Sequence, residues 1–209
     1  PVHEEAVAEI VRRRTPTTQL SVSSDVLPEV KEFERTSTTV INAYVKPVVA
    51  RYLTQLEKRL DAMQFKAPVT VMQSSGGTVR TRVAREHPVY SIESGPAAGV
   101  VGAAALMSHL GIDNAISFDM GGTTAKTCLI ENGEPRLASE YEVGGEMNIG
   151  HRLLRGGGYL LRVPAIDLAE IGAGGGSIAW IDRGKALRVG PQSAGAEPGP
   201  ACYSRGGTG

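Results

Sequence analysis

The sequence predicts a mixed α/β fold rather than a helical bundle or a β-sandwich. The predicted strands and helix follow one another as Val69–Gln73, Val89–Ile92, Pro96–Leu110, Ala115–Phe118 and Lys126–Glu131. This order of strand, helix and strand is typical of α/β proteins. A Gly-Thr turn joins the last two strands, and Asn132-Gly133 predicts a tight hairpin turn after them.

Glycine divides the chain into parts of different character. All 26 glycines lie at or after Gly76, while Val, Ile and Leu stay interleaved with them. This pattern indicates a folded backbone with many positions that need a positive φ or a close approach to a ligand. We expect three segments: a helical part over 1–68 that links from a missing N-terminal domain, an α/β core over 69–134, and a glycine-rich β region over 135–209 that is incomplete at its C-terminus.

Charge and composition exclude several classes of protein. The 209 residues carry 22 Lys or Arg and 22 Asp or Glu, so the net charge is +0 and the basic surface of a nucleic-acid binder is absent. No apolar run approaches the roughly 18 residues that a membrane span requires. Two cysteines, Cys128 and Cys202, cannot build a disulfide network, which favours the cytoplasm. Because the chain begins at Pro1 and ends in Gly-Thr-Gly, we expect a piece of a longer protein.

The glycine-free part predicts two helices and a strand between them. Apolar residues share one face of a short helix over His3–Arg14, and Gln19–Ser23 has the composition of a short strand. Apolar residues at three- and four-residue steps predict a long amphipathic helix over Pro28–Met63, from Phe33 to Leu60. We expect a kink at Pro47, because proline removes a backbone donor.

The chemically most informative segment is Asp119-Met-Gly-Gly-Thr-Thr124. An aspartate at the end of a strand lies at the edge of a sheet, and Gly121 and Gly122 let successive N–H groups face an anion. The hydroxyls of Thr123 and Thr124 add donors to phosphate oxygens, and the Asp119 carboxylate can orient an attacking water or hold Mg²⁺ through water. The alternative is a tight hairpin whose glycines only turn the chain.

Two further segments are candidate ligand sites. Glu93-Ser94-Gly95 precedes a helix whose first N–H groups and positive dipole end favour an anion, although an ordinary helix cap would have the same sequence. The helix from Pro96 is rich in Gly and Ala, so we expect one of its sides to pack closely against a neighbour.

The loop Gly172-Ala-Gly-Gly-Gly-Ser177 predicts either a ligand-facing loop, with Gly174, Gly175, Gly176 and Ser177 at its tip, or a purely structural glycine turn. A dinucleotide fingerprint does not fit, because the segment continues as a strand, Ser177–Ile181. Asp167 and Glu170 flank the loop as polar positioning groups. Four histidines, His3, His87, His109 and His151, lie apart from one another and from both cysteines, so the spacing predicts no zinc site.

Four segments resemble the hydantoinase A/5-oxoprolinase family. They are Glu93-Ser-Gly-Pro-Ala-Ala-Gly-Val-Val-Gly102, Ser117-Phe-Asp-Met-Gly-Gly-Thr-Thr124, Ile171-Gly-Ala-Gly-Gly-Gly-Ser-Ile178 and Gly190-Pro-Gln-Ser-Ala-Gly-Ala-Glu-Pro-Gly-Pro-Ala-Cys-Tyr203. Glu34-Arg-Thr-Ser-Thr-Thr-Val40 resembles the segment that precedes them in that family. The resemblance covers nearly the whole chain and keeps the order of the motifs.

The resemblance implies a partial actin-like, sugar-kinase-like (ribonuclease H-like) ATPase fold with an additional β-rich region. It also implies an ATP-dependent hydrolase that opens cyclic amides of the hydantoin or 5-oxoproline type by phosphorylating a carbonyl, with ATP and Mg²⁺ as cofactors. The related acetone and acetophenone carboxylases carboxylate the activated species instead, and a non-catalytic nucleotide-binding module of the same fold is a third alternative. A second hydantoinase-type subunit is the implied partner.

Two departures from the family pattern affect what the resemblance implies. Where members often read Asp-Met-Gly-Gly-Thr-Ser-Thr-Asp, this chain has Ala125 and Lys126 in place of Thr-Asp, so a cation that could pair with phosphate replaces a carboxylate. The family's N-terminal Asp-x-Gly-Gly-Thr loop and its later adenosine loop do not occur in these 209 residues. We therefore expect the fragment alone to be inactive.

Overall fold

The computed structural model describes residues 1–144 and 158–208. The chain forms two units that are interleaved in the sequence. The first unit comprises residues 1–101, 137–144 and 159–166, and the second the remaining ranges around 102–136 and 167–209. His151 lies outside the described residues. The three continuous segments expected from composition stay a prediction as domains.

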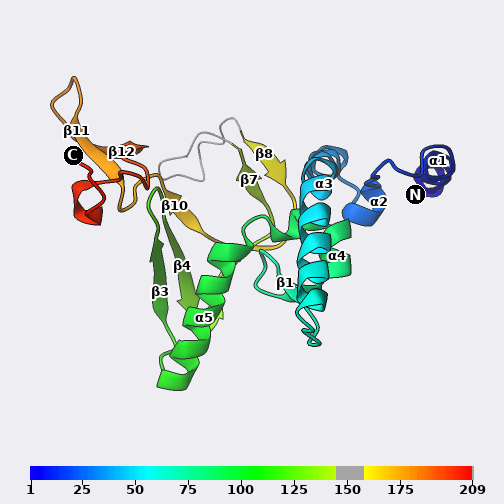
Figure 1. The fold of residues 1–209 in the computed structure, drawn as a ribbon, viewed down its shortest axis with the longest axis horizontal. Helices are drawn as coiled ribbons and strands as arrows, with labels where there is room; N and C mark the ends of the chain where they lie inside the picture. Colours follow the sequence, from blue (N-terminus) through cyan, green and yellow to red (C-terminus); the bar gives the residue numbers. More distant parts are fainter. Residues whose placement is uncertain (145–157, 209) are drawn as a thin grey trace. The chain divides into compact units, whose positions relative to one another are not determined.

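The N-terminal part of the first unit is helical, as Figure 1 shows. Helix α1 spans Val2–Arg14, α2 spans Ser23–Val26 and α3 spans Glu32–Ala62. The strand expected at Gln19–Ser23 is wrong, because Ser23 begins a helix there. The Glu4 carboxylate accepts hydrogen bonds from the Ser23 hydroxyl at 2.9 Å and the Ser24 N–H at 3.0 Å, and this capture fixes the start of α2.

The long helix α3 was predicted correctly, but most of its buried side chains are polar, with Leu53 as the apolar exception. Thr38, Asn42 and Lys46 are buried, whereas Tyr44 is 80% exposed and Val48 is 69% exposed. The amphipathic pattern therefore identified the helix but only part of its packed face, because Val48 is exposed whereas Ile41, Val45, Leu56 and Leu60 are half-buried. Pro47 lies inside α3, and the helix continues through it.

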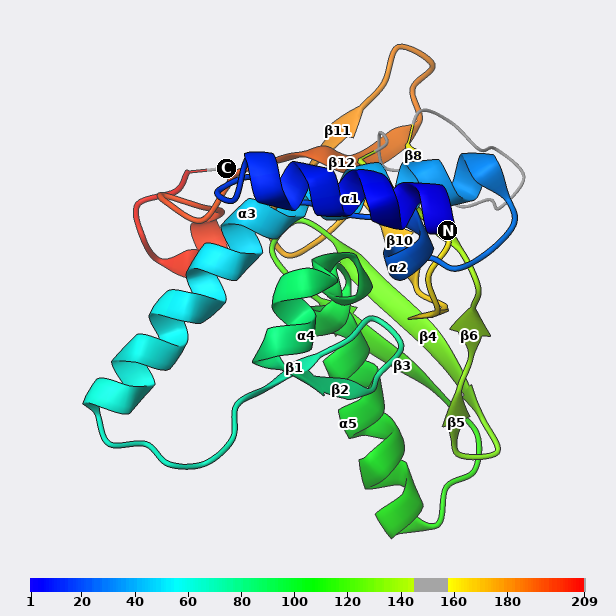
Figure 2. The same cartoon turned by 90° about the vertical axis from the view of Figure 1, so that its right-hand side faces the viewer.

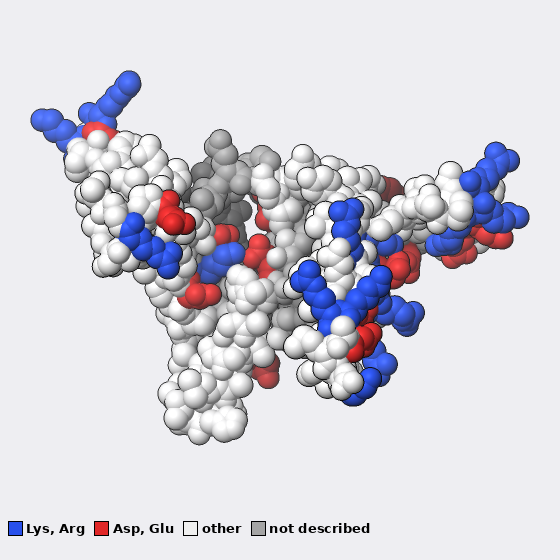
Figure 3. Space-filling view, in the orientation of Figure 1, with Lys and Arg blue, Asp and Glu red and all other residues white. Residues whose placement is uncertain are grey.

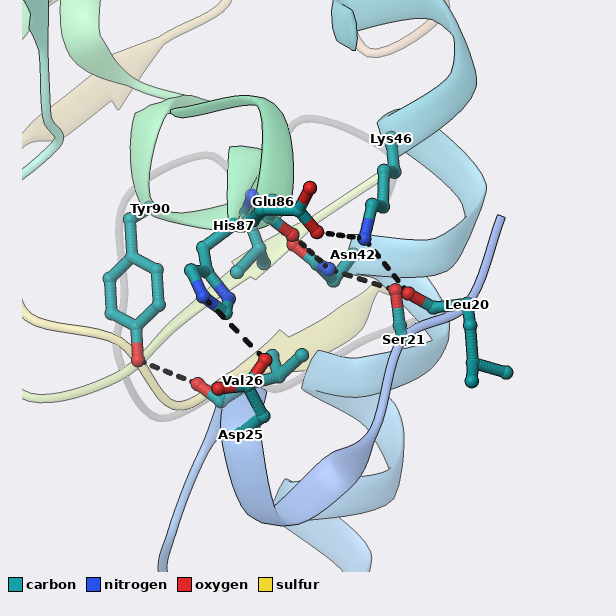
Figure 4. A network of polar contacts seen from close by, with 10 residues as sticks. Leu20, Ser21, Asp25, Val26, Asn42, Lys46, Glu86, His87 and Tyr90 are labelled. Atoms are coloured by element: carbon teal, nitrogen blue, oxygen red, sulfur yellow. Dashed lines mark hydrogen bonds and ion pairs between the residues drawn. The ribbon is translucent and has the colours of Figure 1, made fainter. Parts of the chain in front are cut away.

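Each buried polar group on α3 has a partner in the same unit. The Asn42 amide donates to the Ser21 hydroxyl at 2.9 Å and to the Glu86 carbonyl at 3.1 Å, and its oxygen accepts from the Val89 N–H at 3.2 Å. The Lys46 ammonium donates to the Leu20 carbonyl at 2.8 Å. Figure 4 shows that these bonds tie the segment before α2 and the segment after α4 to one face of α3.

Short strand pairs and helical turns complete the first unit. The hairpin β1 (Thr70–Met72) and β2 (Thr78–Arg80) is followed by helix α4 (Thr81–Glu86) and the 3₁₀ helix η1 (Pro88–Ser91). The strand expected at Val89–Ile92 is wrong: Pro88 sets helical φ at the first position, and the Val89 N–H is bound by Asn42 rather than by a strand.

The other strand pairs of this unit come from the later part of the chain. Strand β6 (Leu137–Ala138) pairs with β9 (Ala165–Ile166), and β7 (Tyr141–Val143) pairs with β8 (Tyr159–Leu161), both antiparallel. A hydrophobic cluster of Val26, Val89, Leu161 and Val163 therefore joins segments that are distant in the sequence.

Helix α5 spans Ser94–Leu110 and ends at Gly111, whose φ of +68° is the expected left-handed stop. The close packing expected for its small residues occurs at Ala97, which is fully buried, and not at its glycines. A Cβ added at Gly95, Gly99 or Gly102 would meet no atom within 4 Å.

The second unit is built on antiparallel strands, which Figure 2 shows beside one another. Strand β4 (Ala125–Glu131) lies between β3 (Ala115–Met120) and β10 (Ala169–Ile171), with β5 (Glu134–Pro135) paired at its end. Asn132 and Gly133 have positive φ, which confirms the predicted turn. Strand β3 is less buried than expected, since Phe118 is 64% exposed.

The glycine-rich C-terminal part adds a two-stranded ribbon. Strand β11 (Ser177–Ile181) pairs with β12 (Leu187–Ser193), and the short 3₁₀ helix η2 (Ala201–Tyr203) follows. No helix in the described ranges is long and apolar enough to cross a bilayer. Figure 3 shows positive and negative side chains interspersed on the face drawn. This distribution agrees with the even charge balance of the sequence.

Candidate functional site

The Gly-Thr segment is the turn of a β-hairpin. Met120 on β3 pairs with Ala125 on β4, which leaves residues 121–124 as the connection. The Gly121 N–H donates to the Thr124 carbonyl at 2.9 Å and closes the turn. The hairpin alternative considered from sequence is therefore correct as a description of the backbone, and the open question is whether the turn also presents donors.

Three donors of this turn remain open. In the described part of the chain, the N–H groups of Gly122, Thr123 and Thr124 have no hydrogen-bond acceptor. Gly122 and Thr123 are exposed, and so is Asp119, whose carboxylate forms no hydrogen bond or ion pair with the described residues. Successive unpaired N–H groups beside two hydroxyls can surround an anion, and a free carboxylate next to them can orient water.

The loop between β10 and β11 packs directly against this turn. The Gly175 N–H donates to the Gly121 carbonyl at 2.9 Å, and the Gly176 N–H donates to the Gly122 carbonyl at 2.8 Å. A Cβ on Gly174 would lie 2.6 Å from the Gly121 carbonyl oxygen. Two predicted site segments are thus in contact, and the glycines of the loop are needed for that contact.

The loop is also fixed internally. The Ser177 hydroxyl accepts from the Gly174 N–H at 2.8 Å, while the Ser177 N–H donates to the Gly174 carbonyl at 3.0 Å. The Gly176 carbonyl accepts from the Ala194 N–H at 2.8 Å and from the Ser193 hydroxyl at 3.1 Å. The N–H groups of residues 174–177 therefore all donate to other protein atoms and are not available to a ligand. This supports the interpretation of the segment as a structural glycine turn.

Tyr203 was not predicted as a site residue. A Cβ on Gly175 would lie 3.5 Å from its hydroxyl, and a Cβ on Gly122 would lie 3.8 Å from it. The Tyr203 hydroxyl therefore lies beside both glycine segments. Its position at the end of the Gly190–Tyr203 motif was the only signal in the sequence, and that motif alone does not show which loop the side chain reaches.

Asp119, Lys126 and Glu170 form a row across three strands. Asp119 lies opposite Lys126 on β3 and β4, and Lys126 lies opposite Glu170 on β4 and β10. Residues directly opposite in antiparallel strands share one face, with Cβ atoms about 4.5–5.5 Å apart. The Lys126 ammonium lies 3.4 Å from a Glu170 carboxylate oxygen, and its side chain is 17% exposed. Lys126 is thus bound to Glu170, which weakens its expected role as a phosphate partner.

Asp167 and Cys128 lie near the row without being candidates for catalysis. The Asp167 carboxylate lies 3.4 Å from the Arg136 guanidinium, and the Asp167 N–H donates to the Arg136 carbonyl at 2.8 Å. Cys128 is buried on β4, and burial raises the pKa of its thiol. A neutral, buried thiol is a poor nucleophile, so this cysteine is a packing residue.

Glu93, Ser94 and Gly95 belong to the first unit, whereas the turn and the glycine loop belong to the second. The Glu93 N–H donates to the Ser74 hydroxyl at 3.0 Å, and the Glu93 carbonyl accepts from the Ala97 N–H in the first turn of α5. Ser94 is the first residue of the helix and the Glu93 carbonyl accepts its first bond, so the cap position is Glu93 and the cap expected at Ser94 or Gly95 is wrong. The anion-binding role of Ser94 and Gly95 and the ligand role of Glu93 stay predictions.

The donor set suits a phosphate group better than a protein-held metal cluster. The described residues contain no group of three His, Cys, Asp or Glu side chains that could hold a metal ion. Asp119 offers one free carboxylate, which suits contact with Mg²⁺ through water, since Mg²⁺ commonly keeps several waters and binds one or two carboxylates together with phosphates.

A model for the hydantoinase/oxoprolinase family matches residues 35–209. An uncharacterised protein of Methanocaldococcus jannaschii is 52% identical to the chain over 99% of its length and 30% of that protein.

Two solved structures are also similar. The crystal structure of ATP-dependent caprolactamase from Pseudomonas jessenii is 38% identical, with a TM-score of 0.77 over 99% of this chain and 28% of that one. The nucleotide-free structure of acetone carboxylase, described as an ATP-dependent carboxylation enzyme, is 30% identical, with a TM-score of 0.68 over 93% of this chain and 26% of that one. The chain shares their α/β fold and spans less than a third of each of these proteins.

Proposed function

The chain belongs to the hydantoinase/oxoprolinase family, and from this premise we propose that it is part of an ATP-dependent hydrolase that opens cyclic amides. The substrate is of the hydantoin or 5-oxoproline type, and its carbonyl is activated by phosphorylation. The fold around the site is part of an actin-like, sugar-kinase-like (ribonuclease H-like) ATPase fold, with an additional β-rich region. The similarity to ATP-dependent caprolactamase supports this reaction.

One observation carries the proposal: among the described residues, three N–H groups of the hairpin turn after Asp119 have no acceptor, although the neighbouring loop binds the carbonyls of Gly121 and Gly122. A turn that served only to reverse the chain would not need a glycine loop packed against its acceptor side. With the acceptors of Gly121 and Gly122 occupied, the turn presents donors to solvent and so favours an anion.

The residues have separate roles in this proposal. Gly121 and Gly122 shape the turn, and the N–H groups of Gly122, Thr123 and Thr124 hold a phosphate group of ATP. Asp119 orients the attacking water or contacts Mg²⁺ through water. When bound, MgATP supplies the phosphoryl group that turns a carbonyl oxygen into a leaving group. Ser94 and Gly95, at the start of α5, present helix N–H groups to a second anion, with Glu93 next to them.

The carboxylase branch is a second candidate function, because acetone carboxylase shares the fold and the family pattern. In that case the activated species is carboxylated rather than hydrolysed. A non-catalytic nucleotide-binding module of the same fold is the third. One relative is named subunit alpha of caprolactamase, so we also propose a second subunit as partner, and a cytoplasmic location in keeping with two free cysteines.

Replacement of Asp119 by Asn in the full-length subunit tests the proposal. The Asp119 side chain is exposed and unpaired in the described chain, so Asn should leave folding unchanged and reduce ATP hydrolysis by about 10²-fold or more, as expected for loss of a water-orienting carboxylate. Unchanged ATP turnover would refute the role of Asp119. Product analysis with and without bicarbonate then separates hydrolase from carboxylase.

Titration with MgATP locates the binding determinants. We expect the complete subunit to bind MgATP and the 209-residue piece to bind it weakly, because the piece has only one of the two phosphate loops of the family. Binding of equal strength by both would show that the Asp119 turn and its surroundings are sufficient.

A further inference from the structure

The face of the sheet that bears Asp119 also bears a lysine between two carboxylates. Strand β4 lies between β3 and β10, and Lys126 on β4 is directly opposite Asp119 on one side and Glu170 on the other. Because the Cβ atoms of directly opposite residues are about 4.5–5.5 Å apart, the four-carbon stem of Lys126 can bring its ammonium to either carboxylate. The proposed function uses Asp119 and assigns no role to Lys126 or Glu170.

The ammonium lies on one of the two carboxylates. Its distance from a Glu170 carboxylate oxygen is 3.4 Å, whereas the Asp119 carboxylate forms no ion pair with the described residues. The Lys126 side chain is 17% exposed and the Glu170 side chain 39%, while Asp119 is exposed. Glu170 therefore contributes to holding the ammonium away from Asp119, although both acids are direct neighbours of Lys126 in the strand register.

The availability of the Asp119 carboxylate depends on this arrangement. A mostly buried ammonium is costly without a nearby negative charge, so the loss of one carboxylate favours contact with another within reach. If Glu170 loses its charge, the carboxylate directly opposite Lys126 on the other neighbouring strand is that of Asp119. An ion pair between Asp119 and Lys126 would occupy the oxygens that the proposed function needs for water or for Mg²⁺ through water.

We propose that Glu170 is a positioning residue, which holds the Lys126 ammonium and thereby keeps the Asp119 carboxylate available. This inference rests on the proposed role of Asp119 and adds a residue on which that role depends. Glu170 touches no reacting atom in this scheme and acts only through Lys126. All three side chains belong to the second unit, so the competition takes place within one sheet.

Four versions of the full-length subunit test the competition: the wild type, Glu170→Gln, Lys126→Met and the double variant. Isothermal titration with Mg²⁺ and a non-hydrolysable ATP analogue measures binding without turnover. An Asp119–Lys126 pair with the strength of a surface ion pair would be formed most of the time, so Glu170→Gln should weaken binding about three- to sixfold. Lys126→Met alone should change binding by less than about twofold, and in the double variant it should restore binding to within about twofold of the wild type. If Glu170→Gln does not fold, Glu170→Asp, whose shorter stem loosens the hold on the ammonium, should show a smaller loss that Lys126→Met again removes.

The four affinities separate competition from a simple effect of charge. If each charge acted only through its electric field, Lys126→Met would strengthen binding by the same factor with or without Glu170. Competition predicts instead that Lys126→Met strengthens binding mainly when Glu170 is replaced. Equal factors in the two backgrounds, or a double variant as weak as Glu170→Gln, would overturn the inference. Glu131→Gln, at an exposed acid on the other face of β4, is the matched control and should leave binding unchanged.

A crystal structure of the Glu170→Gln subunit gives a readout that does not depend on ATP. We expect the Lys126 ammonium within about 4 Å of the Asp119 carboxylate in the variant, and on Glu170 in the wild type. An ammonium that stays away from Asp119 in the variant would overturn the inference. An Asp119–Lys126 pair combined with wild-type analogue binding and ATP turnover would instead refute the proposed role of Asp119 and leave the competition between the two carboxylates standing.

Discussion

Replacement of Gly174 by Ala tests whether the contact between the glycine loop and the Asp119 turn is needed for the site. A Cβ at position 174 would lie 2.6 Å from the Gly121 carbonyl oxygen, 2.7 Å from the Gly122 carbonyl carbon and 2.7 Å from the Thr123 nitrogen. All three atoms are backbone, so no side chain can rotate away. To bring the nearest atom, at 2.6 Å, to ordinary contact at about 3.4 Å, the loop must move by about 0.8 Å relative to the turn.

The energetic effect follows from this displacement. Overpacking of a close contact costs about 1–3 kcal/mol. The bonds from Gly175 to Gly121 and from Gly176 to Gly122 lie in the same contact, and each contributes about 0.5–1.5 kcal/mol net. Together these effects predict a loss of about 2–6 kcal/mol of stability in the loop and turn. The φ of Gly174 is not positive, so the clash rather than the backbone conformation causes the loss.

Hydrogen exchange and ATP turnover measure the outcome in the full-length subunit. The Gly175 and Gly176 amides should exchange faster in Gly174→Ala, and ATP hydrolysis should fall about tenfold or more because the open donors of the turn shift. Gly175→Ala is the matched control, since its Cβ would meet the Tyr203 hydroxyl only at an ordinary 3.5 Å. Normal protection and turnover in Gly174→Ala would refute the reasoning that the loop holds the turn in place.

Three further predictions concern charge and buried polar groups. A double-mutant cycle of Lys126→Met and Glu170→Gln should give a coupling of about 0.5–1 kcal/mol that falls with added salt, and additive effects would mean that the 3.4 Å ion pair contributes nothing. Asn42→Ala should destabilise the protein by about 2–4 kcal/mol in denaturant melts, because a buried N–H and a carbonyl lose their partner; a change below 1 kcal/mol would contradict this. The hydrogen bond from Thr81 lowers the pKa of Glu57, so its stabilisation is present above the pKa of the unfolded state and lost as pH falls through the native pKa. Glu57→Gln should therefore flatten the fall in melting temperature between about pH 5 and pH 3, and an unchanged slope would show that Glu57 does not contribute.

Local signals in the sequence located elements wherever a short segment determines its own conformation. Gly111 ends α5 with a positive φ, and Asn132-Gly133 forms the turn after β4. The strand Ser177–Ile181 has the bounds expected from its apolar run. These elements depend on backbone conformation and on neighbouring residues, which a single sequence contains.

Signals that depend on the rest of the fold were misleading. The apolar stripe on α3 includes Phe33 and Val48, which are exposed, because tertiary bonds from distant segments bury Asn42 and Lys46 instead. Val89 has a high β propensity, yet its N–H is bound by Asn42, which lies 47 positions earlier in the chain. Periodicity predicts that a helix has two faces, and packing decides which face is buried.

The sequence predicted the separate segments of the candidate site but not the contacts between them. The Gly-Thr turn and the glycine loop were both expected to be special, but 50 or so positions separate them, and nothing in either sequence indicates that one donates hydrogen bonds to the other. Tyr203 shows the same limit, because only the fold brings its hydroxyl beside Gly122 and Gly175. The sequence identifies Lys126 as a departure from the family pattern. Its ion pair with Glu170 could not be predicted, because it depends on the register of β10 against β4.

The two interpretations of the Gly-Thr segment, chain reversal and phosphate binding, are compatible once the donors and acceptors are counted separately. The turn uses one donor for its own closure, from Gly121, and the loop occupies the carbonyls of Gly121 and Gly122. In the described chain, the N–H groups of Gly122, Thr123 and Thr124 remain without an acceptor, next to the unpaired Asp119 carboxylate. The hydrogen bonds from the loop to the carbonyls on the other side of the turn hold these N–H groups in place. Such donors are oriented before a ligand arrives, so an anion binds without the cost of ordering the backbone. The rigidity of the hairpin is therefore a condition for the binding role and not an alternative to it.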